Sequence, residues 1–252
     1  MIDFWFILLL VVTGFIAGII NTLAGGGSNL TIPALMVLGM PADVANATNR
    51  VGVLLQSISG IVGFKKHDKL PTNDLPAIIG LIILGGGFGA ATALILSPET
   101  LKYVLLSSMI IMALIMIFVP ELIIAKADAT PKRVSSTRSS WFVLLASGFY
   151  GGLIQAGVGF ILLFALAGSL RYDLVRANAL KLVCTLAFTV TSLVIFIYQD
   201  LILWQPGLAL ALGNIIGAWI AVKIAITIEP RIMKILIFVM TVLAALAVLY
   251  FD

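Results

Sequence analysis

Long apolar segments are the feature of this sequence that most constrains its fold. They cover roughly residues 4–24, 30–39, 44–64, 75–96, 101–124, 141–168, 174–198, 201–226 and 232–251. A helix needs about 20 apolar residues to cross the hydrocarbon core of a bilayer, and most of these segments have that length. The breaks between them are short, and the only markedly polar ones are 65–69 and 126–140. The pattern predicts an all-α fold, a polytopic transmembrane helix bundle.

The composition agrees with a membrane protein and argues against other classes. Hydrophobic residues make up 62% of the chain and charged residues 10%, with a mean hydropathy of +1.20, whereas soluble domains average about 25% charged residues. The net charge of +4 is typical of Lys and Arg in cytoplasmic loops and does not call for a nucleic-acid partner. Cys184 and His67 are the only residues of their kinds, which excludes an intrachain disulfide and a Cys/His zinc cluster. We expect no cofactor.

The two halves of the chain resemble each other at a fixed offset of 132 residues. The matching pairs are Gly25/Gly157, Gly27/Gly159, Asn46/Asn178, Gly85/Gly217, Pro98/Pro230 and Lys102/Lys234. Internal duplication is a common construction in secondary transporters. We therefore predict one membrane domain made of a first repeat over 1–124, a cytoplasmic linker over 125–140 and a second repeat over 141–252.

The distribution of cations distinguishes parallel from inverted repeats. Four spans in each half would give parallel repeats and would spread the basic residues over both membrane faces, against the positive-inside bias. A helical hairpin folded at 25–28, and again at 155–159, followed by three spans gives each half an odd number of crossings. Twelve of the fifteen Lys and Arg residues then share one face, while Lys102 lies on the other and Arg50 and Lys181 lie inside helices. We predict inverted repeats with both termini outside.

The glycine-rich breaks are candidate binding elements, because irregular backbone at membrane depth is tolerated only when it is buried in protein or lines a wet cavity. The alternative is a plain tight turn between packed helices. A break also exposes the amide end of the following helix, which favours anions. The candidates here are Gly26, Gly27, Ser28 and Asn29 in the first break and Gln155 and Gly157 in the second.

Each half also carries a polar stripe with one cation on the helix after its hairpin. The stripes contain Asn46, Asn49 and Arg50, and Asn178, Lys181 and Thr185. A cation at the bilayer centre costs at least about 2.5–3.5 kcal/mol, so its presence indicates either function or snorkelling to the interface. Every Asp and Glu falls at the end of an apolar segment or in a loop, so no buried acid balances the two cations and we expect them to bind a small anion.

The sequence resembles the sulfite exporter TauE/SafE family of integral membrane proteins. The resemblance covers essentially the whole chain and rests on Gly14-x-x-x-Gly18, Gly25-Gly26-Gly27-Ser28, Ile32-Pro33-Ala34-Leu35 and the stretch 39–48, with a weaker echo over 148–178. In the second half Val158-Gly159-Phe160 replaces a richer glycine run, and no proline corresponds to Pro33. The resemblance implies export of sulfite, thiosulfate, small organosulfonates or related anions across the bacterial cytoplasmic (inner) membrane.

The sequence favours a transporter with a midplane substrate site between the halves. An anion channel of similar substrate class is the alternative, and a non-transporting membrane subunit or intramembrane enzyme is a weaker one. Gly-x-Ser-x-Gly, His-Glu-x-x-His and paired intramembrane carboxylates are all missing from the sequence, so we expect no enzyme. The expected partners are a small anion and membrane lipids. The exact anion, the driving ion and the oligomeric state stay open.

Overall fold

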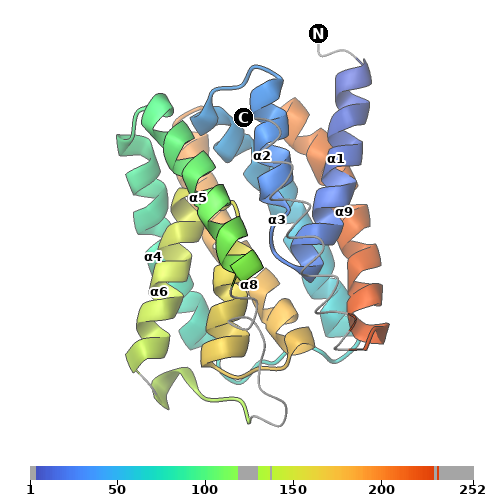
Figure 1. The fold of residues 1–252 in the computed structure, drawn as a ribbon, viewed down its shortest axis with the longest axis vertical. Helices are drawn as coiled ribbons and strands as arrows, with labels where there is room; N and C mark the ends of the chain where they lie inside the picture. Colours follow the sequence, from blue (N-terminus) through green and yellow to red (C-terminus); the bar gives the residue numbers. More distant parts are fainter. Residues whose placement is uncertain (1–3, 119–129, 137, 230–231, 233–252) are drawn as a thin grey trace.

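The computed structural model describes residues 4–118, 130–136, 138–229 and 232. Within these ranges the chain forms helices joined by short connections and contains no strand, which confirms the predicted all-α bundle (Figure 1). The first half contains α1 (Phe4–Leu23), α2 (Ser28–Val37), α3 (Ala42–Lys66), α4 (Leu75–Ile95) and α5 (Pro98–Phe118). The second half contains η2 (Val134–Ser136), α6 (Arg138–Leu153), α7 (Val158–Leu163), η3 (Phe164–Ser169), α8 (Leu174–Tyr198) and α9 (Trp204–Thr227).

These helices follow the apolar segments closely, because burial in lipid or against another helix requires an unbroken apolar run. By length and hydropathy, α1, α4, α8 and α9 could each cross a membrane. One boundary differs from the prediction: α6 begins at Arg138, inside the segment predicted as linker. The predicted segment over 232–251 and the start of the linker at 125–129 lie almost wholly outside the described residues.

The chain is interrupted at both predicted breaks and turns back there. Residues 24–27 separate α1 from α2, and residues 154–157 separate α6 from α7. A pocket wall that contains both Leu9 of α1 and Val37 of α2 shows that these helices run in opposite directions. In the second half the N–H of Lys132, just before α6, donates to the carbonyl of Leu170, just after η3, at 2.8 Å. Both segments are therefore helical hairpins.

Glycines let the first helix of each hairpin pack tightly against a helix of the other half. A Cβ on any of four glycines would overlap the backbone of the facing helix: Gly14 and Gly18 of α1 on α9, and Gly148 and Gly152 of α6 on α4. Small residues of this kind drive helix association in membranes, because the backbones can approach closely. Thus α1 of the first half packs on α9 of the second, and α6 of the second packs on α4 of the first.

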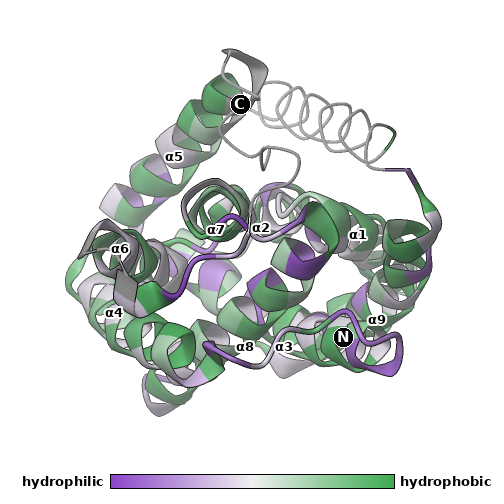
Figure 2. Ribbon diagram, turned by 90° about the horizontal axis from the view of Figure 1, so that it is seen from below, coloured by the Kyte–Doolittle hydropathy of each residue, from purple (hydrophilic) through white to green (hydrophobic). Residues whose placement is uncertain are grey.

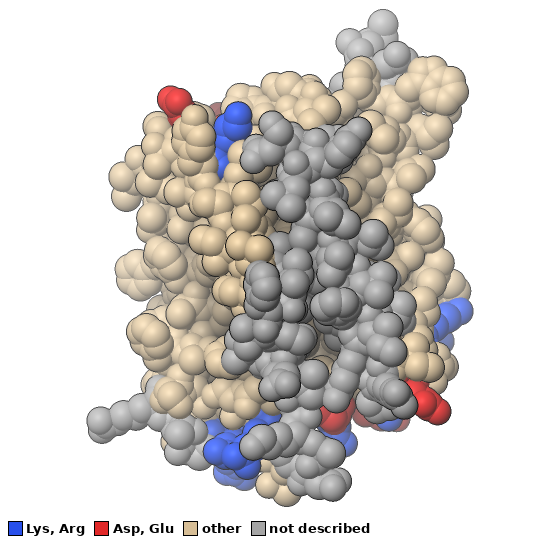
Figure 3. All heavy atoms as spheres, viewed as in Figure 1, with Lys and Arg blue, Asp and Glu red and all other residues tan. Residues whose placement is uncertain are grey.

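Several connections rich in Lys and Arg lie together at one end of the bundle, which we call the basic end. The N–H of Val134 donates to Oδ2 of Asp74 at 2.9 Å and thereby joins η2 to the connection between α3 and α4. Gly63 near the end of α3 lies against Val222 near the end of α9. Figure 3 shows most of the Lys and Arg atoms toward this lower end, with one such group near the upper end. Seen from the basic end, hydrophilic connections lie over mostly hydrophobic helices (Figure 2).

Candidate functional site

The two hairpin tips meet inside the bundle. A Cβ on Gly25 would overlap Cα of Gly159, and a Cβ on Gly159 would overlap Cα of Gly25. Gly25 also has a φ of +99°, a conformation that L side chains rarely adopt. Beside this contact, a Cβ on Gly26 would lie 2.9 Å from Cζ of Phe160. Glycine is therefore required where the first break touches the second.

The first turn of α2 is held from the side by α3. Nδ2 of Asn49 donates to Oγ of Ser28 at 3.0 Å, and the hydroxyl of Thr31 donates to Oδ1 of Asn49 at 2.5 Å. Asn49, Ser28 and Thr31 are all buried. This arrangement places the amide end of α2 in the interior beside the tip contact, with the N–H groups of Asn29 and Leu30 already donating to the carbonyls of Gly26 and Gly27.

Arg50 of α3 binds the end of α6. Its Nη1 donates to the carbonyl of Gly151 at 3.0 Å and its Nη2 to the carbonyl of Gly152 at 2.7 Å. The guanidinium also lies over the ring of Phe196, with Cζ 5.0 Å from the ring centroid. Asn46, one turn earlier on α3, donates Nδ2 to the carbonyl of Leu153 at 3.0 Å. Together these two side chains satisfy the last carbonyls of α6.

Lys181 of α8 binds the end of α1 in the corresponding way. Its Nζ donates to the carbonyls of Asn21 at 2.8 Å and Thr22 at 3.0 Å, and to Oδ1 of Asn178 at 2.7 Å. An ammonium group has three N–H donors, so all of them are used. Lys181 therefore has no free donor for a further ligand in this arrangement.

Both cations are thus caps on helix C-termini that belong to the opposite half of the chain. A helix C-terminus carries about half a negative charge, which helps offset the cost of burying a cation. Arg50 is 0% and Lys181 1% exposed, so neither side chain snorkels to the surface. The sequence predicts buried cations without an acidic partner, and no Asp or Glu is buried in the described part of the chain. That backbone carbonyls are the partners cannot be read from the sequence.

Buried polar atoms without partners gather around the second break. Gln155 has a φ of +64° and is 2% exposed. Neither its Nε2 nor its Oε1 has a hydrogen-bond partner among the described residues. The same holds for Oδ1 of Asn29, Oδ1 of Asn46 and Nε of Arg50. Oδ1 of Asn29 faces the break, 3.7 Å from a Cβ built on Gly157. Unpaired buried polar groups cost free energy and indicate a place for water or a ligand.

Other predicted site residues have structural contacts of their own. Gly27 lies against Ala17 within the first hairpin, where a side chain would overlap the backbone. Thr185 donates its hydroxyl to the carbonyl of Lys181 at 2.8 Å, one turn back in the same helix. Gly157 has a φ of +70° and faces Met112 of α5. All of the predicted site residues are buried. They lie either at one of the two breaks or on the polar faces of α3 and α8, which carry the caps of α6 and α1.

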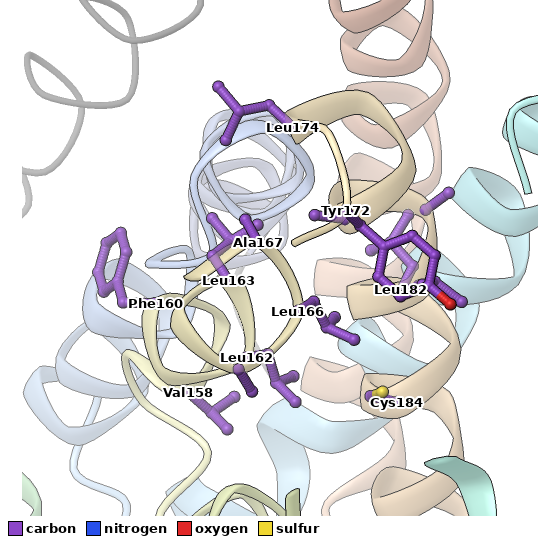
Figure 4. Packing of buried hydrophobic residues seen from close by; sticks show 14 of the residues in the cluster. Val158, Phe160, Leu162, Leu163, Leu166, Ala167, Tyr172, Leu174, Leu182 and Cys184 are labelled. Carbon is purple, nitrogen blue, oxygen red and sulfur yellow. The ribbon is translucent and has the colours of Figure 1, made fainter. Parts of the chain in front are cut away.

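The structure also adds residues that the sequence analysis did not single out. Asn21 and Thr22 contribute backbone carbonyls, which no side-chain pattern reveals. Tyr150 donates its hydroxyl to the carbonyl of Ala156 at 2.8 Å and so supports the second break from α6. The apolar side of this hairpin faces α8, where Figure 4 shows Leu166 beside Leu182 and Cys184. For Tyr150, its position five residues before Gln155 is a sequence signal that could have placed it near the second break.

Comparisons with known proteins agree with this architecture. The family described as "Sulfite exporter TauE/SafE" matches residues 10–248. A probable membrane transporter protein of Haemophilus influenzae is 26% identical over 237 residues, which cover 94% of this chain and 92% of that protein. Probable membrane transporter proteins of a Sinorhizobium species and of Escherichia coli are each 25% identical, over 95% and 93% of this chain and 91% and 86% of their own lengths.

Proposed function

Because the chain belongs to the sulfite exporter TauE/SafE family, whose curated relatives are membrane transporters, we propose that it exports small sulfur-containing anions. Sulfite, thiosulfate and organosulfonates are the substrate class. The site lies at mid-membrane between two inverted repeats, where the hairpin tips meet.

The charge around the two tips is the observation that carries this proposal. Arg50 and Lys181 bring two buried positive charges, and no carboxylate is buried in the described residues. The C-termini of α1 and α6 and the N-termini of α2 and α7 contribute about −0.5 and +0.5 elementary charge each, so their sum is about zero. About two positive charges therefore remain uncompensated in the protein interior, and one small anion balances one of them as a monoanion or both as a dianion.

The contacts divide the predicted site residues by role. The anion binds between the amide end of α2, with Gly26, Ser28 and Asn29, and the second break, with Gln155 and Gly157. Arg50 is next to this space and still has an unused Nε donor. Asn46 and Asn49 fix the helix ends that frame the space. Lys181, held by Asn178, contributes its charge from the end of α1 without touching the anion.

The orientation follows from the same reasoning about charge. The basic end faces the cytoplasm of a bacterial inner membrane, since cytoplasmic loops carry the excess of Lys and Arg. The reciprocal packing of α1 on α9 and of α6 on α4 supports two repeats, and their inversion is supported by the opposite directions of α1 and α6, which begin at opposite ends of the bundle (Figure 1). Single cysteines at Lys66 and Arg133 in a variant lacking Cys184 would react with an impermeant maleimide only from the cytoplasmic side. Labelling of either position from outside would overturn this orientation.

Transport in proteoliposomes tests the function. Purified protein is reconstituted with internal sulfite, thiosulfate or an alkanesulfonate, and counterflow of the ³⁵S-labelled anion is measured. We expect trans-stimulated uptake, which a channel does not give, and we expect Arg50→Gln to reduce it. Lys102→Gln is the matched control, because Lys102 is an exposed cation near the start of α5. No flux of any anion in the panel would refute the proposal.

A further inference from the structure

Around the second break lie buried oxygen acceptors that a fully deprotonated oxyanion cannot satisfy. Oδ1 of Asn29, Oδ1 of Asn46 and Oε1 of Gln155 have no donor among the described residues. The orientation of the Asn46 amide is fixed, because its Nδ2 donates to Leu153. Each of these side chains is at least nine-tenths buried. These three oxygens are therefore acceptors that could bind a donor of a ligand. Nε of Arg50 is a buried donor that is also unpaired.

Sulfite and thiosulfate dianions offer only acceptor oxygens to such a site. Their oxygens would pair with Nε of Arg50, Nε2 of Gln155 and the helix amides, but they would leave the three protein oxygens unpaired and would face them with like partial charge. An anion that also carries an O–H group pairs with both kinds of atom. A hydroxyl-bearing sulfonate has this combination at a single negative charge.

We propose that the site selects sulfur-containing monoanions that carry a hydroxyl donor, with Gln155 as the residue that determines this selectivity. The inference rests on the proposed function and specifies the substrate class of the same site. Burying an acceptor without a donor costs about 1–3 kcal/mol, which corresponds to a roughly 5- to 150-fold difference in affinity.

Two sulfonates that differ only in a hydroxyl group provide the test. Binding of isethionate (2-hydroxyethanesulfonate) and ethanesulfonate to the purified protein is measured by calorimetry. We expect isethionate to bind roughly 5- to 150-fold more tightly. Equal affinity would overturn the inference while leaving the proposed function intact. Failure of both anions, and of sulfite and thiosulfate, to bind would instead overturn the proposed function.

Two variants test whether Gln155 determines the selectivity. Gln155→Leu removes the donor and the acceptor of the amide group and should reduce the affinity ratio toward one. Asn214→Leu is the matched control, since Oδ1 of Asn214 is also buried without a donor but this side chain lies elsewhere, with its Nδ2 against Gly52 of α3. An unchanged ratio in Gln155→Leu, or an equal loss in Asn214→Leu, would contradict the role of Gln155. The wild-type ratio tests the selectivity even if a variant fails to fold.

A second inference rests on a different observation, the unequal ends of the bundle. Opposite the basic end, a cavity of about 460 Å³ is lined by residues 38–41, between α2 and α3, and by residues 203–206, at the start of α9. At the repeat offset of 132 residues, the corresponding segments at the basic end are 170–173 and 71–74. The linker between the halves occupies that place.

Two hydrogen bonds donated by backbone N–H groups show how closely the linker fits there. Lys132 donates its N–H to Leu170 at 2.8 Å, and Val134 donates its N–H to Asp74 at 2.9 Å. The side chain of Val134 is fully buried, and its carbonyl accepts from Nε1 of Trp141 at 3.0 Å. We infer that residues 132–134 are a plug that closes the basic end while the opposite end is open, and that they leave this position when the basic end opens.

The native thiol of Cys184 reports on the plug. It is buried on α8 behind the η3–α8 contact (Figure 4), so its alkylation by a maleimide requires opening. We expect Asp74→Ala, which removes the acceptor for Val134, to increase the alkylation rate at least fivefold at an unchanged melting temperature. Val134→Ser, which places a hydroxyl in the same buried position, should act in the same direction. Lys69→Ala, an exposed residue of the same connection, is the control. Unchanged rates in both plug variants, or an equal increase in the control, would overturn the inference.

Discussion

Replacing Lys181 with Met distinguishes two roles of this residue, that of a helix cap and that of a substrate ligand. The thioether keeps most of the side-chain volume but removes the ammonium group. The carbonyls of Asn21 and Thr22 and Oδ1 of Asn178 then lose the donor that satisfies them. The end of α1, immediately before the first break, would be left with unpaired acceptors in the interior.

The size of the effect follows from counting acceptors. Each buried acceptor left without a donor costs about 1–3 kcal/mol, so three of them cost about 3–9 kcal/mol. The variant no longer holds an ammonium group in the membrane interior, which returns about 2.5–3.5 kcal/mol. A net loss of about 3 kcal/mol in the free energy of unfolding is the central expectation. Arg50→Met frees two carbonyls, those of Gly151 and Gly152, and should cost about 2 kcal/mol less.

Thermal unfolding of the purified protein in detergent measures the difference. Lys223→Met is the control, because Lys223 is exposed and stacks on Trp219 with Nζ 3.4 Å from the ring centroid; at an exposed site this contact is worth about 0.5–1 kcal/mol. The expected order of stability is Lys223→Met, then Arg50→Met, then Lys181→Met. Wild-type stability in Lys181→Met together with loss of anion binding would refute the reasoning and identify Lys181 as a direct ligand.

Further variants test the packing of the tips and of the cation. Gly25→Ala should lose about 2–5 kcal/mol of stability, from the overlap with Gly159 and the left-handed φ, and a wild-type melting temperature would contradict the tip contact. Gly80→Ala should be neutral or gain up to about 1 kcal/mol from helix propensity, because nothing lies within 4 Å of the new Cβ; a lowered melting temperature would show a contact there. Phe196→Leu should lose about 0.5–2 kcal/mol through the ring that faces Arg50, and an equal loss in a background already lacking the Arg50 guanidinium would contradict this cause.

The helices and both breaks could be predicted from the sequence because they depend on local patterns. Lipid requires long apolar runs, and a glycine cluster within such a run marks a place where the backbone departs from the helix. The burial of Arg50 and Lys181 was also predictable, since each lies well inside a long helix with polar neighbours on one face. These inferences need only the spacing of residues along one segment.

The partners of the two cations could not be predicted in the same way. They are backbone carbonyls, and they lie more than a hundred residues away in the sequence, at Gly151 for Arg50 and at Asn21 for Lys181. A carbonyl at a helix end has no residue type of its own to recognise. The left-handed φ of Gln155 was equally hidden, because a glutamine rarely adopts it and the adjacent glycines are the more obvious candidates.

Each half of the chain caps a helix of the other half, and this limits how the halves can move relative to each other. Lys181 on α8 holds the end of α1, and α1 packs through glycines on α9; Arg50 on α3 holds the end of α6, and α6 packs through glycines on α4. A movement of one sequence half against the other would break both caps and leave buried carbonyls and a buried cation at each, at several kcal/mol per cap. A movement that keeps α1 with α8 and α9, and α6 with α3 and α4, breaks neither. The displacement then falls on the contacts of α3 with α8 and α9, of α4 with α8, and on the hydrogen bonds that join Asn49 of α3 to α2. The moving units that keep both caps are therefore mixed, each consisting of the first helix of one half and the long helices of the other.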